Sequence, residues 1–204
     1  MNETINLSKG QRIDLTKVAP NTSKFAFALG WNPQKFDGKA FDLDATAFLT
    51  KDGKASSVAD FVFYGMSGFD ASTGIKNYKG FISHSGDDQT GGKAGDDEII
   101  TVDVTKIDTN IYNDIQFNVT IYEADVRKQT FGQVDDAFIR VYDVDTQKEI
   151  CRYDLTEDYS GNTAIVVGRL YFKDGSWRFQ SVGGGYNGGL SALCSGVGLS
   201  ANNG

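Results

Sequence analysis

The chain has 204 residues, with 27 acidic against 20 basic side chains and a net charge of −7. Of the 27 acids, 22 are Asp and 5 are Glu, and Asp favours turns and caps because its short side chain competes for backbone hydrogen bonds. This balance excludes nucleic acid as the expected partner, because phosphates demand a basic face. A cation is the expected partner for the surplus carboxylates.

Nothing in the composition indicates a membrane or a secreted protein. No run approaches the ~18 apolar residues of a membrane span, and Met1–Leu7 lacks the basic segment and apolar run of a secretory signal. Cys151 and Cys194 are too few for a disulfide framework, so we expect free thiols. These features predict a cytoplasmic protein with no direct membrane span.

Period-two alternation of apolar and polar residues predicts a series of short strands. The pattern is cleanest in Asp114–Tyr122, where Ile115, Phe117 and Val119 alternate with polar side chains. The predicted strands, in chain order, are Ile5–Ser8, Arg12–Thr16, Lys24–Leu29, Phe41–Leu49, Asp60–Tyr64, Glu98–Val104, Asp114–Tyr122, Ala137–Tyr142, Glu149–Leu155, Ala164–Phe172 and Trp177–Val182.

The connections between these strands are rich in turn residues and poor in helical periodicity. Asp52-Gly53 and Asp174-Gly175 are hairpin-turn signals, whereas short helices are expected only within Val104–Asn113 and Gly189–Ser195. Many short strands without a linker predict an all-β fold, a two-sheet antiparallel β-sandwich with one or two short helices. We expect one domain over residues 1–195, followed by a flexible C-terminal tail over residues 196–204.

Two acids of the strand Phe41–Leu49 point to a cation. Alternation places Asp42 and Asp44 on the same face, opposite the apolar residues. Two like charges on one face repel, and a cation or a set of donors between them relieves the repulsion. The alternative is that both side chains simply face water.

The second acidic segment covers residues 85–98. It carries Asp87, Asp88, Asp96, Asp97 and Glu98 among several glycines. Ca²⁺ takes oxygen ligands from flexible loops, and Gly lets a backbone fold so that carboxylates converge. The spacing matches neither an EF-hand nor a phosphate loop. Together with Asp42 and Asp44 these five acids are the candidate metal ligands, and a solvated acidic loop is the alternative.

Catalytic patterns are scarce. His84 is the one histidine, and we expect it to cap or pack near the acidic segment rather than to bind a ligand. The nucleophile pattern Gly-x-Ser-x-Gly is absent, so we expect no enzyme, with a metal-dependent hydrolase as the minor alternative. The glycine run Gly183–Gly189 is interpreted as a flexible crossover rather than an anion-binding nest.

The order of these motifs resembles the tellurite-resistance TerD family of bacterial stress proteins, over about residues 5–195. The matching segments are Leu7-Ser8-Lys9-Gly10, Gly30-Trp31, Phe41-Asp42-Leu43-Asp44-Ala45, Asp60-Phe61-Val62-Phe63-Tyr64, Gly86-Asp87, Gly95-Asp96-Asp97-Glu98, Val119-Thr120-Ile121-Tyr122, Phe131-Gly132-Gln133-Val134, Phe138-Ile139-Arg140-Val141, Arg152-Tyr153-Asp154-Leu155, Gly183-Gly184-Gly185-Tyr186 and Gly189-Leu190.

The resemblance implies a cytoplasmic calcium-binding stress-response protein that acts by binding rather than by catalysis. It implies one or two Ca²⁺ ions held by the acidic loop and the Asp-x-Asp strand, and other tellurite-resistance proteins at the membrane as partners. The alternative is a Ca²⁺-dependent docking module for a membrane, a nucleotide or a protein. Two features depart from the family pattern: Gly92-Lys93-Ala94 replaces an acidic stretch, and the connection between Tyr64 and Gly86 is longer.

Overall fold

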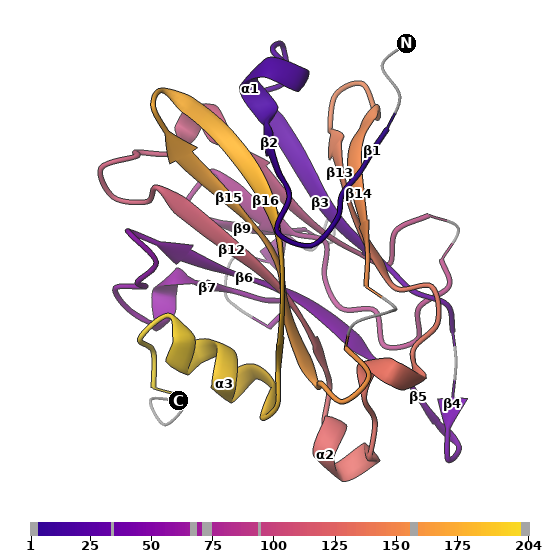
Figure 1. Cartoon of the computed structure of the whole chain (residues 1–204). Coiled ribbons are helices and arrows are strands. Elements are labelled where there is room, and N and C mark those ends of the chain that lie inside the picture. Colours follow the sequence, from indigo (N-terminus) through magenta and orange to yellow (C-terminus); the bar gives the residue numbers. More distant parts are fainter. Residues whose placement is uncertain are drawn as a thin grey trace.

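Two β-sheets lie face to face in the computed structural model (Figure 1). The structure describes residues 4–33, 35–65, 69–70, 75–93, 95–155 and 159–200. The two sheets and the scarcity of helix confirm the predicted all-β sandwich. No helix in the described part of the chain is both long and apolar enough to cross a membrane.

Sheet A is antiparallel except where its short edge strand β1 runs parallel to β14. Its described strands are, in order across the sheet, β1 (Ile5–Asn6), β14 (Glu149–Asp154), β13 (Phe138–Asp143), β3 (Lys24–Gly30), β11 (Glu98–Asp103), β10 (Ile82–His84), β9 (Ile75–Tyr78) and β8 (Phe69–Asp70).

Sheet B is antiparallel throughout its described strands. They are, in order, β2 (Arg12–Asp14), β16 (Ser176–Tyr186), β15 (Ala164–Lys173), β12 (Asp114–Ile121), β6 (Leu43–Thr50) and β7 (Phe61–Val62). A separate ribbon pairs β4 (Lys35–Phe36) with β5 (Lys39–Ala40).

The main core fills the space between the two sheets. The inward side chains of the alternating strands meet there, and the rings of Phe27 and Phe117 stack across it with centroids 3.9 Å apart. Leu29, Ile115 and Leu170 are fully buried in the same core. Each such side chain contributes about 1.5–3 kcal/mol by leaving water. Because alternation places these side chains on one face of each strand, it drives the two sheets to pack face to face.

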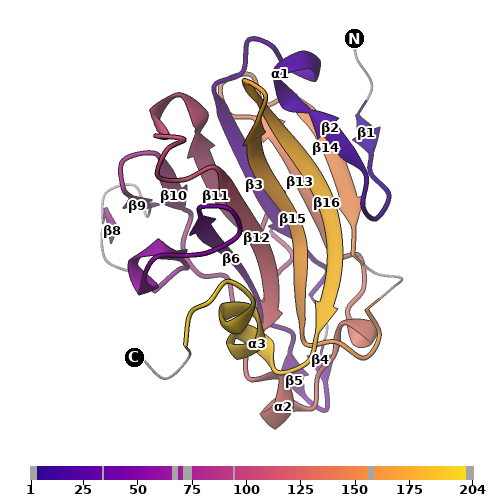
Figure 2. The same cartoon turned by 60° about the vertical axis from the view of Figure 1, so that its left-hand side comes forward.

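Helices are short and lie outside the sheets. In the described residues the α-helices are α1 (Leu15–Val18), α2 (Ala124–Arg127) and α3 (Gly189–Gly196), and the 3₁₀ turns are η1 (Val58–Asp60), η2 (Val104–Lys106) and η3 (Phe131–Gln133). Figure 2 shows α3 against the outer face of sheet B, and α1 and α2 at opposite ends of the molecule. The predicted helix within 189–195 is therefore confirmed.

A second, smaller core lies under α3. Leu193 packs there with Phe48 and Val166 of sheet B, and Val197 is buried in the same cluster. The amide of Ala55 donates a hydrogen bond to the Val197 carbonyl (3.1 Å). The first part of the segment predicted as a flexible tail is thus packed, because it carries apolar side chains that cover Phe48.

Two local predictions are corrected by the structure. The expected strand Arg12–Thr16 ends at Asp14, because the Asp14 side chain accepts a hydrogen bond from the Lys17 amide and begins α1. The glycine run expected as a crossover is instead mostly strand: β16 continues to Tyr186, where Gly184 and Gly185 pair with β15. Gly185 fits this position because the Asn162 side chain occupies the space that a Cβ would need.

Candidate metal centre

Three carboxylates converge where β6 begins and the β10–β11 connection crosses it. Asp42 directly precedes β6, Asp44 is its second residue, and Asp87 comes from the connection. One oxygen from each lies within 4.8 Å of the others. Ca²⁺–oxygen distances of about 2.3–2.6 Å allow two ligands up to about 5 Å apart. A single Ca²⁺ therefore has room to contact all three carboxylates, which we call the acid triad.

The acid triad is electrostatically unfavourable without a cation. Burial, followed by the negative charges of Asp42 and Asp87, raises the pKa of Asp44 to about 7. Burial and the charge of Asp87 raise the pKa of Asp42 to about 6, although Arg127 opposes this rise. Like charges in a desolvated place disfavour the ionised form, so a bound cation would stabilise the three ionised side chains together.

One buried oxygen of the acid triad has no hydrogen-bond partner within the described structure. Asp42 Oδ1 is buried and accepts no hydrogen bond, and an unsatisfied buried polar atom costs free energy. The other oxygen, Oδ2, lies 3.7 Å from the Arg127 guanidinium, which also lies 3.7 Å from Glu123. A hard cation would coordinate Oδ1. This unpartnered oxygen is evidence for a metal that does not depend on the number of negative charges.

Glu98, another predicted ligand, lies beneath the acid triad as a structural tie. Its two carboxyl oxygens accept hydrogen bonds from the Ala45 amide (2.6 Å) and the Asp88 amide (3.1 Å). It is fully buried, and this burial raises its pKa to about 9 despite the two amide donors. Glu98 therefore links β6 to the acidic segment from within the protein.

Asp88 and Asp97, also predicted as ligands, shape the acidic segment. Asp88 Oδ1 accepts hydrogen bonds from the Thr90 and Gly91 amides, and its Oδ2 pairs with the Lys93 ammonium at 2.7 Å. Asp97 accepts from the amides of Trp31 and Lys93, each at 2.9 Å. Lys93, the cation that departs from the family pattern, thus neutralises Asp88, whose hydrogen bonds shape the acidic segment.

Asp96 is held on the other side of the segment by Arg140. The guanidinium donates from Nε at 2.7 Å and from Nη2 at 2.8 Å, and its Nη1 reaches Glu149 at 3.2 Å. This two-bond geometry is the strongest form of carboxylate recognition by arginine. Asp96 therefore anchors the acidic segment to β13 and β14 of sheet A.

The seven predicted ligands divide by position. The structure brings together Asp42, Asp44 and Asp87, and it gives Asp88, Asp96, Asp97 and Glu98 hydrogen-bonding roles around them. Sequence reasoning missed Arg127 and Arg140, which pair with these acids. No spacing signal identifies them, because each comes from an element distant in sequence from its partner.

The one histidine packs as expected. His84 is fully buried; its Nδ1 accepts from the Gly86 amide (3.0 Å), so Nε2 carries the proton and donates to the Ala45 carbonyl (2.9 Å). The thiols of Cys151 and Cys194 are free, as expected, and burial raises the pKa of Cys151 to about 12. The His84 ring and the Cys151 thiol are thus both enclosed by the protein, whereas Cys194 is half-buried.

An apolar pocket of about 390 Å³ adjoins the acid triad. Its lining includes Asp44, Leu190 of α3 and the aromatic residues Phe61, Phe63, Tyr64 and Tyr122. The rings of Phe61 and Phe63 stack there with centroids 4.8 Å apart. An apolar cavity beside charged oxygens is the usual form of a small-ligand site.

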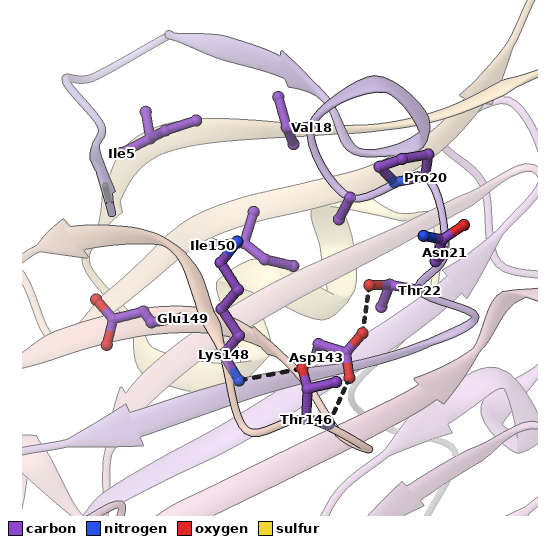
Figure 3. A pocket seen from close by; sticks show the side chains of 11 residues that line it. Ile5, Val18, Pro20, Asn21, Thr22, Asp143, Thr146, Lys148, Glu149 and Ile150 are labelled. Atoms are coloured by element: carbon purple, nitrogen blue, oxygen red, sulfur yellow. Dashed lines mark hydrogen bonds between the residues drawn. The ribbon is translucent and has the colours of Figure 1, made fainter. Parts of the chain in front are cut away.

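A larger hollow of about 770 Å³ lies away from the acid triad, between the α1 region and the β13–β14 hairpin (Figure 3). Its carboxylates are already bound within the protein: Asp143 accepts hydrogen bonds from the Thr22 hydroxyl and from the Thr146 amide (2.8 Å). Glu149 pairs with Arg140. Size alone therefore does not make this hollow the candidate site.

Comparison with known proteins agrees with this architecture and these motifs. The family model described as TerD domain matches residues 3–196. The chain belongs to the TerD family. General stress protein 16U of Bacillus subtilis (strain 168) is 43% identical over 198 residues, which cover 96% of this chain and 98% of that protein. The tellurium resistance protein TerD of an Alcaligenes species is 42% identical over 199 residues, covering 97% and 99%.

A solved structure has the same fold as this TerD-family chain. The crystal structure of a telluride resistance protein (TerD) homologue from Streptomyces coelicolor A3(2) superposes with a TM-score of 0.65. The superposition covers 86% of this chain and 96% of that one, at 20% sequence identity. This similarity supports the fold, and the chain's membership of a family of tellurium resistance and general stress proteins rests on the sequence matches.

Proposed function

We propose that this TerD-family protein is a calcium-binding stress-response protein, and that the acid triad holds one Ca²⁺ ion. The observation that carries the proposal is the meeting of three carboxylates, two of them buried, one of which, Asp42, has a buried oxygen (Oδ1) without a hydrogen-bond partner in the described structure. Carboxylate oxygens from a strand and a glycine-containing loop are typical Ca²⁺ ligands. Water and backbone carbonyls would complete the shell.

The proposed role of the ion is to stabilise the end of the sandwich. Ca²⁺ would cancel the repulsion between Asp42, Asp44 and Asp87, and it would tie the connection that carries Asp87 to β6. A ligand that binds only the folded state stabilises it by RT ln(1 + [L]/Kd), or about 2.7 kcal/mol at a hundred times Kd. Calcium binding would thereby make this end of the sandwich more stable and better ordered.

We propose action by binding rather than by catalysis. The enclosed ring of His84 and the buried thiol of Cys151 support this, because each lacks access to a substrate. The names of the relatives, which describe resistance and stress proteins, are in keeping with it. We further propose a cytoplasmic location and other tellurite-resistance proteins at the membrane as partners; calcium-dependent co-purification with such proteins would test this.

Titration calorimetry tests the metal proposal directly. Asp87 is exposed and its carboxylate contacts only the Gln89 side chain among the described hydrogen bonds, so Asp87→Asn should leave the fold intact. We expect one Ca²⁺ per chain for the unmodified protein and at least tenfold weaker binding for Asp87→Asn. Asp145→Asn, an exposed substitution in the β13–β14 turn, is the matched control and should bind normally. Unchanged binding by Asp87→Asn would overturn the proposal.

A second candidate function is Ca²⁺-dependent docking. The apolar pocket supports it, because Asp44 belongs both to the pocket wall and to the acid triad. A partner seated against Phe61 and Phe63 would then meet the ion. Vesicle and pull-down assays with Ca²⁺ and with a chelator test this: binding should require Ca²⁺ and be lost in Asp87→Asn. A partner that binds equally in chelator would exclude metal-dependent docking.

A further inference from the structure

A group of cations lies on the outer face of sheet B, over β2, β16 and β15. The group lines a depression of about 560 Å³. We call it the cationic face; it consists of Arg12, Lys17, Arg169, Lys173 and Arg178, with Asp14, Tyr171 and Gln180 between them. It is unexpected on a chain whose net charge is −7, and the proposed calcium function does not use it.

Strand register explains how the cationic face forms. Arg12 pairs with Gln180, which pairs with Arg169, and this makes one row across three strands. Asp14, Arg178 and Tyr171 make the neighbouring row in the same way. Directly paired residues share a face of the sheet, as do residues two apart on one strand. The intervening Phe179 is buried in the core, so both rows lie on the outer side.

The carboxylates around the cationic face do not balance its charge. Arg169 pairs with Asp114, and Arg178 has Asp174 at 3.4 Å and Asp14 at 3.9 Å. Lys17 shares Asp14 at 3.8 Å. Five cations against these three acids leave a net charge of about +2, by simple charge counting.

Two members of the cationic face form no ion pair with any described residue. Arg12 and Lys173 are exposed, and neither has a carboxylate within 4.0 Å in the described residues. Arg12 also adds to the effect of burial in lowering the pKa of Arg169. In addition, Arg178 Nε is buried without a hydrogen-bond partner in the described part of the chain. The cationic face therefore has hydrogen-bond donors and positive charge that the described residues do not satisfy.

We propose that the cationic face binds the phosphate group of a small phosphate monoester. Arginine guanidinium groups match the oxygens of phosphate with paired, charge-assisted hydrogen bonds. Arg12, Arg169 and Arg178 border the depression on three strands, with the Gln180 amide and the Tyr171 hydroxyl as further donors. The Arg169 guanidinium lies 5.2 Å from the Tyr171 ring centre, which holds it in place.

The size of the depression and the overall charge favour a small molecule. Its volume is within the range of small-ligand pockets, about 300–1,000 Å³. A long polyanion would extend beyond the cationic face onto a chain with surplus acid, which would repel it. The organic part of the monoester would lie over Tyr171 and the stem of Lys173.

The site is independent of the acid triad. Asp44 pairs with Thr120, which pairs with Ala164 at the start of β15, whereas the cationic face uses residues 169–173 of that strand. Five to nine residues correspond to about 16–30 Å at about 3.3 Å per residue. Loss of calcium binding would therefore leave this inference standing.

Amide-resolved NMR titration of the full chain tests the proposal, with inorganic phosphate and phenyl phosphate as probes. Saturable shifts should be centred on β2, β15 and β16. Arg12→Gln combined with Lys173→Gln should weaken binding about tenfold or more, since two charged donors are lost. Lys24→Gln combined with Lys54→Gln removes the same charge elsewhere and should leave binding unchanged. Both pairs are exposed, so the amide spectra should show an intact fold.

Three results would overturn the proposal. The first is that neither probe causes saturable chemical-shift changes. The second is that the changes are centred away from β2, β15 and β16. The third is equal weakening by both double variants, which would indicate a general charge effect. Phosphatidylcholine vesicles with and without phosphatidic acid distinguish the source of the phosphate: binding to the acidic vesicles without binding of phenyl phosphate would assign the face to a lipid headgroup and contradict the small-molecule site.

Discussion

Replacing Asp44 by Asn removes a buried charge from the acid triad while nearly keeping the shape of the side chain. In the folded protein the pKa of Asp44 is about 7, against an ordinary value of 3.8. A rise of about three units corresponds to about 4 kcal/mol, at 1.36 kcal/mol per unit. Without metal, the ionised carboxylate therefore opposes folding by about this amount when the pH is above 7.

The sign of the pH dependence follows from where the proton is bound. Between pH 3.8 and 7 the folded state holds the Asp44 proton more tightly than the unfolded state, so stability falls as the pH rises through this window. Asn carries no such proton. In chelator, Asp44→Asn should be more stable than the unmodified protein by as much as about 4 kcal/mol at pH 8, and by less than about 1 kcal/mol near pH 4.

Urea unfolding in chelator at pH 4 and pH 8 measures this difference, and the same curves with Ca²⁺ should show that Asp44→Asn has lost the calcium-dependent gain. Asp145→Asn serves as the control and should change stability equally little at both pH values. A stability difference for Asp44→Asn that does not change with pH, or a loss of stability at pH 8, would refute the electrostatic account of the acid triad.

Three further predictions concern proton release by Asp44, the anchoring of Asp96 by Arg140, and the buried thiol of Cys151. Because Asp44 is about half protonated at pH 7, Ca²⁺ binding should release about half a proton; calorimetry in two buffers of different ionisation enthalpy measures this, and no buffer dependence would contradict it. Arg140→Gln leaves the half-buried Asp96 without its two-bond partner, so we expect a loss of about 2 kcal/mol in urea unfolding; a neutral effect would contradict the anchoring role. Cys151 should resist iodoacetamide at pH 8 until the protein unfolds, because its thiol is buried with a pKa of about 12; rapid alkylation of the folded protein, followed by mass spectrometry, would contradict this.

The sequence predicted those features that depend on neighbouring residues. Alternation placed most strands, and the two-residue spacing placed Asp42 and Asp44 together, since a strand presents every second residue on one face. Local chemistry also anticipated the packed role of His84. Period-two alternation shows which side chains of each strand face the core, and the burial of those side chains holds the two sheets together.

The rest depended on contacts between distant segments. Asp96 and Arg140 are far apart in the chain, and only the pairing of β13 and β11 with β3 brings them together. Asp88 could not be separated from Asp87 by sequence, because the direction of each side chain depends on the backbone turn that Asp88 itself stabilises. An acidic loop thus predicts a cation site more readily than it predicts which acids bind the cation.

Crystals grown with Ca²⁺ offer the most direct test of the proposed metal centre. An anomalous difference map should show one peak between the carboxylates of Asp42, Asp44 and Asp87, with ligand oxygens at about 2.3–2.6 Å, and Asp42 Oδ1 should be one of them. A map without a peak at this position, or with its peak at Asp88, Asp96 or Asp97 instead, would contradict the account.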